Sequence, residues 1–386
     1  AITVLKNQNN LIPLQRLDTL RIAYLEIGKG KGNYFREQMD LYAPFQTFSL
    51  SSNPSSEELN VLSRNIEEYN LLIVGFHSIQ SSPSRSFGVD PQVASFLAEL
   101  GGRKKVIANI FGSPYSISKL KNTSSFDGFV VSYDNAPITQ SLTAQLIFGG
   151  VTVNGRLPVS ASKDYPKGSG VEAGSIIRLK YSIPEELNIP SLHFQSIDSI
   201  AYDAIQNFAT PGMQILVAKN GVVIYNKCFG NHTYSKDFPV TNSSIYDVSS
   251  VTKIAATLPL TMQLHAKEKF LLEDTLGQYI SLPDTSSLNG LKIYDILLHQ
   301  SGLGAWYPFY QKTLLSLWPE QSFFSNQFSD IHPYQIGHTR FMGKHLIPSY
   351  HYYRSKYSFD FPHEVATGLY ANEWIKDSIM HWIQKM

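Results

Sequence analysis

Short apolar runs alternate with amphipathic segments along residues 21–150, and this alternation restricts the possible fold more than any other feature. The run LLIVGF at 71–76 contains no charged or hydrogen-bonding side chain. A strand that is apolar on both faces belongs in a parallel sheet with helices on both sides. We therefore predict an α/β domain with a doubly wound, mostly parallel sheet in three layers. The expected strands are 21–28, 45–50, 71–76, 105–111 and 126–133.

The segments between these strands carry helix start and stop signals. Ser55 and Ser56 precede two glutamates, and Asp90 is followed by proline, so both sites suit a helix start. The helix expected over 136–150 ends in two glycines, as helices often do. These signals agree with the alternation of strands and helices.

The alternation of strands and helices ends near residue 163, which predicts a domain boundary. We assign 1–163 to the α/β domain, 164–193 to a linker rich in Gly, Ser and charge, and 194–386 to a second domain. In that domain a helix is expected over 194–208, followed by a β-hairpin over 212–230 with Asn220-Gly221 at its turn. A helical block then follows, so the second domain is predicted to be α+β.

The composition excludes several classes of protein. The chain has 386 residues, which suits two domains, and its formal net charge of +1 argues against nucleic-acid binding. Its one cysteine, Cys228, excludes an internal disulfide, and we interpret it as a small buried side chain. No CxxC or HExxH spacing occurs, so we expect no metal and no other cofactor. No apolar run is as long as a membrane span of roughly 18 residues.

The sequence begins at Ala1 with AITVLKNQNNLIPL, which lacks the basic start and long apolar centre of a signal peptide. We therefore expect that the chain is cut from a longer protein.

Ser-x-x-Lys occurs four times, and only the pair Ser250 and Lys253 has a context that suits catalysis. Ser250 is expected at a helix N-terminus, and Lys253 lies three residues along on the same helix face. The following VTKIAATLPLTMQL is apolar nearly all round and predicts a buried helix. Burial lowers the pKa of a lysine, and a neutral amine beside a hydroxyl can act as a general base. The alternative is an N-cap serine with a lysine that reaches solvent.

Three stretches of the second domain resemble the class C β-lactamase and penicillin-binding-protein superfamily: IYDVSSVTKIAATL, LEDTLGQYI (272–280) and LKIYDILLHQSGL (291–303). The similarity includes the 212–230 hairpin. The resemblance implies that Ser250 is acylated and that Lys253 helps to take its proton. His299 and Ser301 belong to a structural signature of that family.

The family uses two further motifs, a tyrosine motif and a Lys-Thr-Gly or His-x-Gly strand. Tyr370-Ala371-Asn372 fits the letters of the first, but EWIKDSIMHWIQKM follows it instead of a glycine-rich apolar helix, so Tyr370 is a weak candidate. The second motif is absent from the sequence. We therefore expect that the serine hydrolase domain is incomplete and that its active site is not whole.

The first half has a different resemblance. The segments 1–14 and LTAQLIFGGVTVNGRLPVSAS (142–162) are similar to the ends of the C-terminal α/β domain of glycoside hydrolase family 3. GFHSIQSSPSRSFG (75–88) resembles the β-N-acetylglucosaminidase branch. This implies that the glycosidic chemistry belongs to a preceding TIM barrel, which would be an intramolecular partner. A loop at the carboxyl end of a parallel strand carries the possible substrate residues His77, Ser84 and Arg85.

We interpret the chain as a fragment of a bacterial, exported or periplasmic hydrolase that acts on cell-wall or related glycans. Its expected substrate is a glycan or peptidoglycan-like molecule. One alternative is a non-catalytic accessory or interaction module with a vestigial Ser-Lys pair. Another is a nucleotide-binding regulator, which depends on the glycines of GKGKG (28–32).

Overall fold

The computed structural model describes the chain except for residues 1, 29–32, 78, 305–306, 338 and 385–386. It groups the chain into two compact units, residues 1–245 and residues 246–386. The predicted boundaries of the domains and linker stay predictions.

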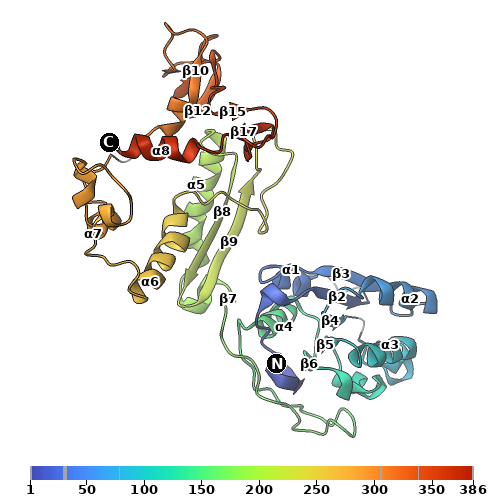
Figure 1. The fold of residues 1–386 in the computed structure, drawn as a ribbon. Helices are drawn as coiled ribbons and strands as arrows, with labels where there is room; N and C mark the ends of the chain where they lie inside the picture. Colours follow the sequence, from blue (N-terminus) through green and yellow to red (C-terminus); the bar gives the residue numbers. More distant parts are fainter. Residues whose placement is uncertain (1, 29–32, 78, 305–306, 338, 385–386) are drawn as a thin grey trace. The chain divides into compact units, whose positions relative to one another are not determined.

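The first unit begins with a six-stranded sheet in the order β1-β6-β5-β4-β2-β3 (Figure 1). The neighbouring strands from β3 through β6 pair in parallel, as predicted, and only β1 pairs antiparallel, with β6. The sequence reasoning missed β1, which lies at the sheet edge. The strands are β1 Thr3–Asn7, β2 Ile22–Ile27, β3 Gln46–Leu50, β4 Leu71–Phe76, β5 Lys105–Ile110 and β6 Gly128–Val131.

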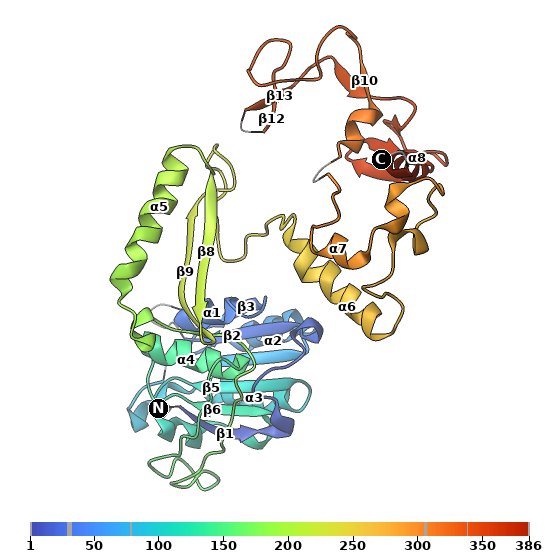
Figure 2. The same cartoon turned by 90° about the vertical axis from the view of Figure 1, so that its left-hand side faces the viewer.

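Helices cover both faces of this sheet, which confirms the doubly wound, three-layer prediction (Figure 2). One buried cluster joins α2 and α3 to one face, and a second cluster joins α1 and α4 to the other. Residues of β4 alternate between them, because successive side chains of a strand point to opposite faces. The helices are α1 Tyr34–Asp40, α2 Ser56–Asn65, α3 Pro91–Gly101 and α4 Pro137–Phe148.

The helix signals act as the sequence indicated. Ser55 caps α2 in a capping box with Glu58, and Asp90 accepts hydrogen bonds from the first turn of α3. Gly149 ends α4 in the left-handed conformation that glycine adopts most easily.

A small three-stranded sheet completes the first unit, in the order β7-β9-β8. The predicted hairpin is present, and Asn220 and Gly221 both have positive φ at its turn. Helix α5 lies beside the hairpin in both views and packs on it through Ala201, Tyr225 and Phe229 (Figures 1 and 2). The elements are β7 Lys180–Tyr181, α5 Gln195–Gln206, β8 Gly212–Lys219 and β9 Val222–Gly230.

The described residues of the second unit form three α-helices and short antiparallel sheets. The helices are α6 Leu258–Ala266, which continues from a π-helical turn at Lys253–Thr257, α7 Ile293–Leu297 and α8 Ile375–Gln384. The strands are β10 Leu314–Ser316, β11 Phe324–Ser325, β12 Tyr334–Gly337, β13 Arg340–Met342, β14 Leu346–Pro348, β15 Tyr353–Arg354, β16 His363–Ala366 and β17 Leu369–Ala371.

Gly75 in β4 is required by the close approach of two side chains. A Cβ atom at this position would lie 2.8 Å from His77 Nε2 and 2.9 Å from Tyr24 Oη. We predict that Gly75→Ala destabilises the chain by about 1–3 kcal/mol, because the added methyl group overpacks a closed core. Thermal or urea unfolding measures the change.

Gly102→Ala is the matched control. Its Cβ would approach only the Glu99 carbonyl, at 3.4 Å, and its φ of −78° suits alanine. If Gly75→Ala unfolds no more easily than Gly102→Ala, the packing around Tyr24 and His77 is looser than the structure indicates.

Candidate functional site

Ser250 and Lys253 are in direct contact. Lys253 Nζ donates a hydrogen bond to Ser250 Oγ over 3.0 Å. Ser250 directly precedes the helical segment that continues into α6, and Lys253 is the first residue of the π-helical turn. The prediction from the sequence spacing, that both side chains share one helix face, agrees with this geometry. The distance is short enough for a proton to pass between nitrogen and oxygen.

The turn before Ser250 is held by an interaction that the sequence reasoning missed. Asp247 Oδ1 accepts a hydrogen bond from Ser249 N over 2.8 Å, and Ser249 has a positive φ of 42°. Residues other than glycine rarely adopt this conformation. The signal was the Asp-x-Ser spacing, because an aspartate side chain commonly closes a turn onto the backbone two residues later.

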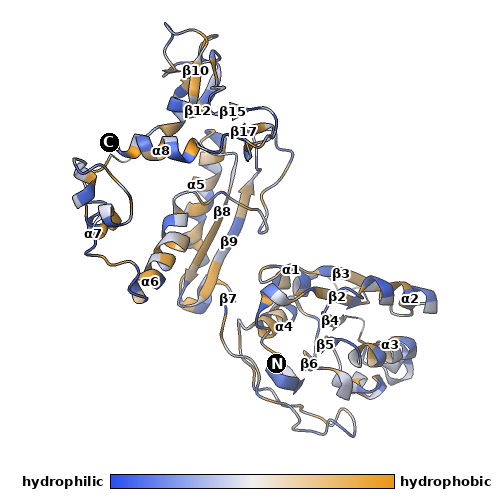
Figure 3. Cartoon of the chain, viewed as in Figure 1, coloured by the Kyte–Doolittle hydropathy of each residue, from blue (hydrophilic) through white to orange (hydrophobic). Residues whose placement is uncertain are grey.

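The sequence predicted that the helix following Ser250 is buried, and within the second unit this prediction is wrong. Ser250, Lys253 and most of α6 are exposed, and Figure 3 shows the hydrophobic residues along this helix. Ile254 is 67% exposed and Met262 is 62% exposed. The segment is apolar, as its sequence indicates, but a helix is buried only where another structural element packs over it. The three buried apolar clusters formed by described residues all lie within 1–245.

This exposure changes what the pair can do. The activation expected from the sequence needs a desolvated amine, because loss of water favours the neutral form of lysine. The described residues of the second unit do not exclude water from Lys253. The geometry for proton transfer is therefore present, whereas the desolvation is not.

Tyr370 lies in β17, which pairs with β15 and β16. The negative charge of Glu364, followed by burial, raises the pKa of Tyr370. Because its pKa is raised, Tyr370 forms the phenolate that a general base would need less readily. Among the residues that the structure describes, no hydrogen bond joins Tyr370 to Ser250 or Lys253. Its neighbour Asn372 is buried and donates to the His351 carbonyl over 2.8 Å, which is a structural contact.

His77 follows β4 and lies in the interior rather than on a loop surface. Tyr24 Oη contacts His77 Nε2 at 2.8 Å, and Asn135 Oδ1 contacts His77 Nδ1 at 2.9 Å. The ring also stacks on Phe111. Burial, opposed by the hydrogen bond to Asn135, lowers the pKa of His77. Ser84 and Arg85 are exposed, so the structure separates this trio into one buried and two exposed side chains.

The structure also locates the cysteine noted in the sequence, whereas it describes little of the glycine-rich segment. Cys228 is half-buried in β9, its thiol donates to Asn242 Oδ1, and burial raises its pKa. Most of GKGKG lies outside the described residues. Within the described part of the chain, no cluster of three metal-ligating side chains occurs. No helix there is long and apolar enough to span a membrane.

Part of this chain matches a known protein family. A family model described as Beta-lactamase matches residues 202–323. This match begins in α5, includes the hairpin and Ser250-Lys253, and ends before β11. No curated protein matches the chain.

Several solved structures are similar to parts of it. A glycoside hydrolase family 3 beta-N-acetylglucosaminidase from Paenibacillus sp. str. FPU-7 is 17% identical with a TM-score of 0.35, over 42% of this chain and 30% of that one. A beta-glucosidase from Listeria innocua is 15% identical with a TM-score of 0.33, over 42% and 26%. A fungal multi-domain GH3 beta-N-acetylglucosaminidase is 15% identical with a TM-score of 0.35, over 78% and 36%. The chain spans less than half of each of these proteins.

The lowered pKa of His77 makes stability depend on pH. The unfolded chain takes up a proton on this histidine below its ordinary pKa of 6.5, whereas the folded chain resists it. We predict that the contribution of His77 is complete above pH 6.5 and is lost as the pH falls toward its lower folded value. Unfolding measured between pH 8 and pH 5 tests this.

The control for this prediction is His77→Gln, which cannot titrate. Its stability is expected to change less between pH 6.5 and pH 5 than that of the unsubstituted chain. The same pH dependence in both proteins would show that His77 is not the responsible group.

The family match covers residues 202–323, and both the β-lactamase-like motifs noted in the sequence and the Ser250-Lys253 contact fall within this range. Residues 202–323, which follow the α/β domain, match the Beta-lactamase family model, and this match points to hydrolase activity in general.

Proposed function

We propose that this chain is part of a bacterial, exported hydrolase that acts on cell-wall or related glycans. It combines the α/β domain of a β-N-acetylglucosaminidase-type glycosidase with a serine acyl hydrolase domain. The observation that carries the serine hydrolase part is the 3.0 Å contact between Lys253 Nζ and Ser250 Oγ within the family-matched residues. With such a substrate the protein would be periplasmic or exported.

The proposed reaction forms an acyl-enzyme. Ser250 Oγ attacks the carbonyl carbon of an amide or ester, and its proton passes to the neutral amine of Lys253. The tetrahedral intermediate collapses when the bond to the leaving amine or alcohol breaks, and that group takes up the proton held by Lys253. Water then attacks the acyl carbon and gives a proton to Lys253, which passes it to Ser250 Oγ as the acid is released.

The glycosidase part of the proposal depends on the end motifs and on the doubly wound sheet. We propose that a TIM barrel supplies the carboxylates for glycosidic cleavage, since no such pair is assigned to this chain. The α/β domain would act as its intramolecular partner. The expected substrates are β-N-acetylglucosaminides for the barrel and peptide- or ester-bearing glycans for Ser250.

One observation favours a second candidate function. The exposure of Ser250, Lys253 and α6 fits a non-catalytic interaction module, in which the Ser-Lys pair is vestigial. Such a module would keep the hydrogen bond but would not react.

A fluorophosphonate probe on the intact protein separates the two functions. We predict that the intact protein is labelled at Ser250 and that Ser250→Ala abolishes the labelling. Lys253→Met is expected to slow labelling by about 100-fold or more, because general-base catalysis typically contributes 10²–10⁴-fold. Mass spectrometry of the labelled peptide identifies the site.

Ser249→Ala is the matched control, since Ser249 is adjacent and has no contact with Lys253 Nζ in the described structure. It should keep its labelling. The chain of 386 residues alone is expected to label poorly, because it lacks a Lys-Thr-Gly or His-x-Gly strand. No labelling of the intact protein contradicts the enzyme and favours the interaction module.

A further inference from the structure

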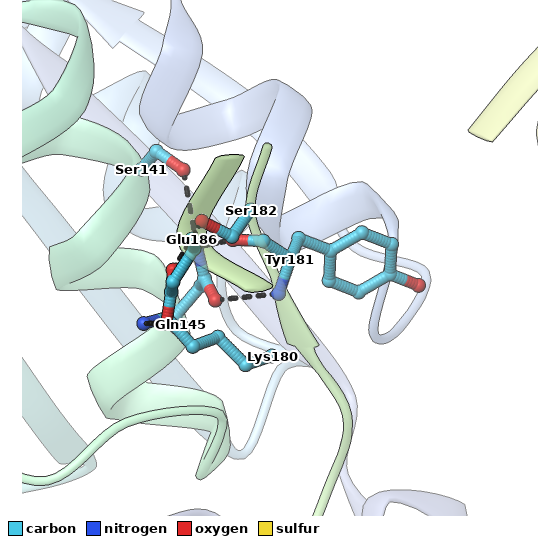
Figure 4. A network of polar contacts seen from close by, with 6 residues as sticks. All are labelled: Ser141, Gln145, Lys180, Tyr181, Ser182 and Glu186. Atoms are coloured by element: carbon cyan, nitrogen blue, oxygen red, sulfur yellow. Dashed lines mark hydrogen bonds and ion pairs between the residues drawn. The ribbon is translucent and has the colours of Figure 1, made fainter. Parts of the chain in front are cut away.

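The three-stranded sheet β7-β9-β8 has two edges, and they differ in how they are covered. At the β7 edge, Gln145 Oε1 accepts a hydrogen bond from Tyr181 N over 2.8 Å, and Gln145 Nε2 donates to Tyr181 O over 2.9 Å (Figure 4). A side chain therefore occupies the backbone groups that β7 turns outward. β8 forms the other edge, and among the described residues it pairs only with β9.

The backbone groups along the outer side of β8 are available for pairing. The Pro211 carbonyl accepts from Asn231 N over 3.0 Å, so the odd-numbered residues of β8 face β9. Gln214 and Leu216, which lie between them, turn their N–H and C=O groups toward the open edge. Within the described part of the chain, no backbone hydrogen bond reaches these groups from outside the sheet. A row of unpaired backbone groups is a template for another strand.

The packing of β8 is less complete than that of β9. Tyr225 and Phe229 of β9 are buried against α5, with exposures of 7% and 5%. Ile215 and Val217 of β8 belong to the same apolar layer but are only half-buried, and Leu216 on the opposite face is 46% exposed. A strand beside β8 would cover side chains on both faces. The open edge and the incomplete packing therefore point independently to a neighbouring strand.

The other sheet edges of the first unit differ from that of β8. Val171 N donates to the Val4 carbonyl over 2.8 Å and so covers part of β1. β3 is only five residues long, and Glu57 and Glu58 line the cleft beside it. β8 is eight residues long, contains no proline, and carries its one charge at its last residue, Lys219. Short length, proline and charge are the usual protections of an edge strand, so β8 is the least protected edge.

The chemistry of β8 favours a second copy of the same strand. Its sequence is GMQILVAK, so a highly charged peptide would find no counter-charge along the middle of the strand. Two antiparallel copies place their Lys219 side chains at opposite ends, whereas two parallel copies would place these like charges side by side. A twofold axis perpendicular to the sheet relates the antiparallel copies, so both α5 helices then lie on one face of the sheet.

We propose that the free edge of β8 pairs antiparallel with β8 of a second copy of this chain. The two three-stranded sheets then form one continuous sheet, with β8 and its copy at the centre. The outward N–H and C=O groups of Gln214 and Leu216 become paired, and the half-buried layer beside α5 packs against the same layer of the copy. The contact is symmetric and closes on itself, so it produces a dimer. It requires no reaction at Ser250.

Sedimentation equilibrium of the 386-residue chain at increasing concentration tests this proposal. We expect a reversible equilibrium between monomer and dimer. Leu216→Pro should raise the dissociation constant at least about tenfold, because it removes an N–H group that faces the open edge. The β8–β9 hydrogen bonds stay in place, since the odd-numbered residues make them. Hydrogen exchange of the β8 amides should be slower in concentrated than in dilute samples.

Ser49→Pro is the matched control. The Leu50 carbonyl accepts from Gly28 N, so Ser49 faces away from β2 on the open edge of β3. It should leave the dissociation constant unchanged. Circular dichroism checks that each variant is folded, and Leu216→Lys and Ser49→Lys, which place a charge at the same edges, replace proline variants that are not.

Three results overturn the proposal. One is a chain that stays monomeric at every concentration. The second is a dimer that the Leu216 variant leaves intact. The third is a dimer that the Ser49 variant weakens as much as the Leu216 variant does.

Discussion

The pairing of the Gln145 side chain with the backbone of Tyr181 joins α4 to β7, and β7 in turn pairs with β9. Gln145 is almost fully buried on α4, and its two hydrogen bonds occupy both polar groups of one residue of β7. An amide side chain can replace a neighbouring strand in this way because it carries the same donor and acceptor as a peptide. Breaking the pair would leave buried polar atoms without partners, which costs more than an ordinary hydrogen bond gains.

The surrounding contacts show why this segment is held although its composition predicts a linker. Arg178 donates to the carbonyls of Leu14 and Phe148, and Tyr42 packs edge-on against Tyr181. Leu14 and Tyr42 lie more than 100 residues before the residues that they contact in this segment, so local composition could not reveal these contacts. The content of Gly, Ser and charged residues reflects the part of the segment that faces water. It does not indicate which few side chains hold the end of the segment.

The sequence predicted the parallel sheet well because each strand carries its own local signal. β4 is buried on both faces, and its apolar run shows this without reference to any neighbour. The edge strand β1 was missed because its pairing with β6 is a contact over more than 100 residues. The Ser250-Lys253 contact could be predicted from spacing alone, since residues three apart on a helix lie on one face. The burial of α6 could not, because burial depends on what covers the helix.

The chemistry proposed for Ser250 therefore depends on the exclusion of water from Lys253 more than on the distance between Nζ and Oγ. Nζ and Oγ already lie within hydrogen-bonding reach, and the ammonium form of a lysine can make that bond as a donor. Only the neutral amine can accept the hydroxyl proton, and desolvation is the general way in which proteins favour it. Large apolar side chains along the π-helical turn and α6, such as Ile254 and Met262, are exposed in the described unit. An element that covers them would desolvate Lys253 at the same time. In this arrangement the packing of the apolar helix and the proposed activation of its serine would be one event, so an element that covers α6 would be needed for the proposed reaction.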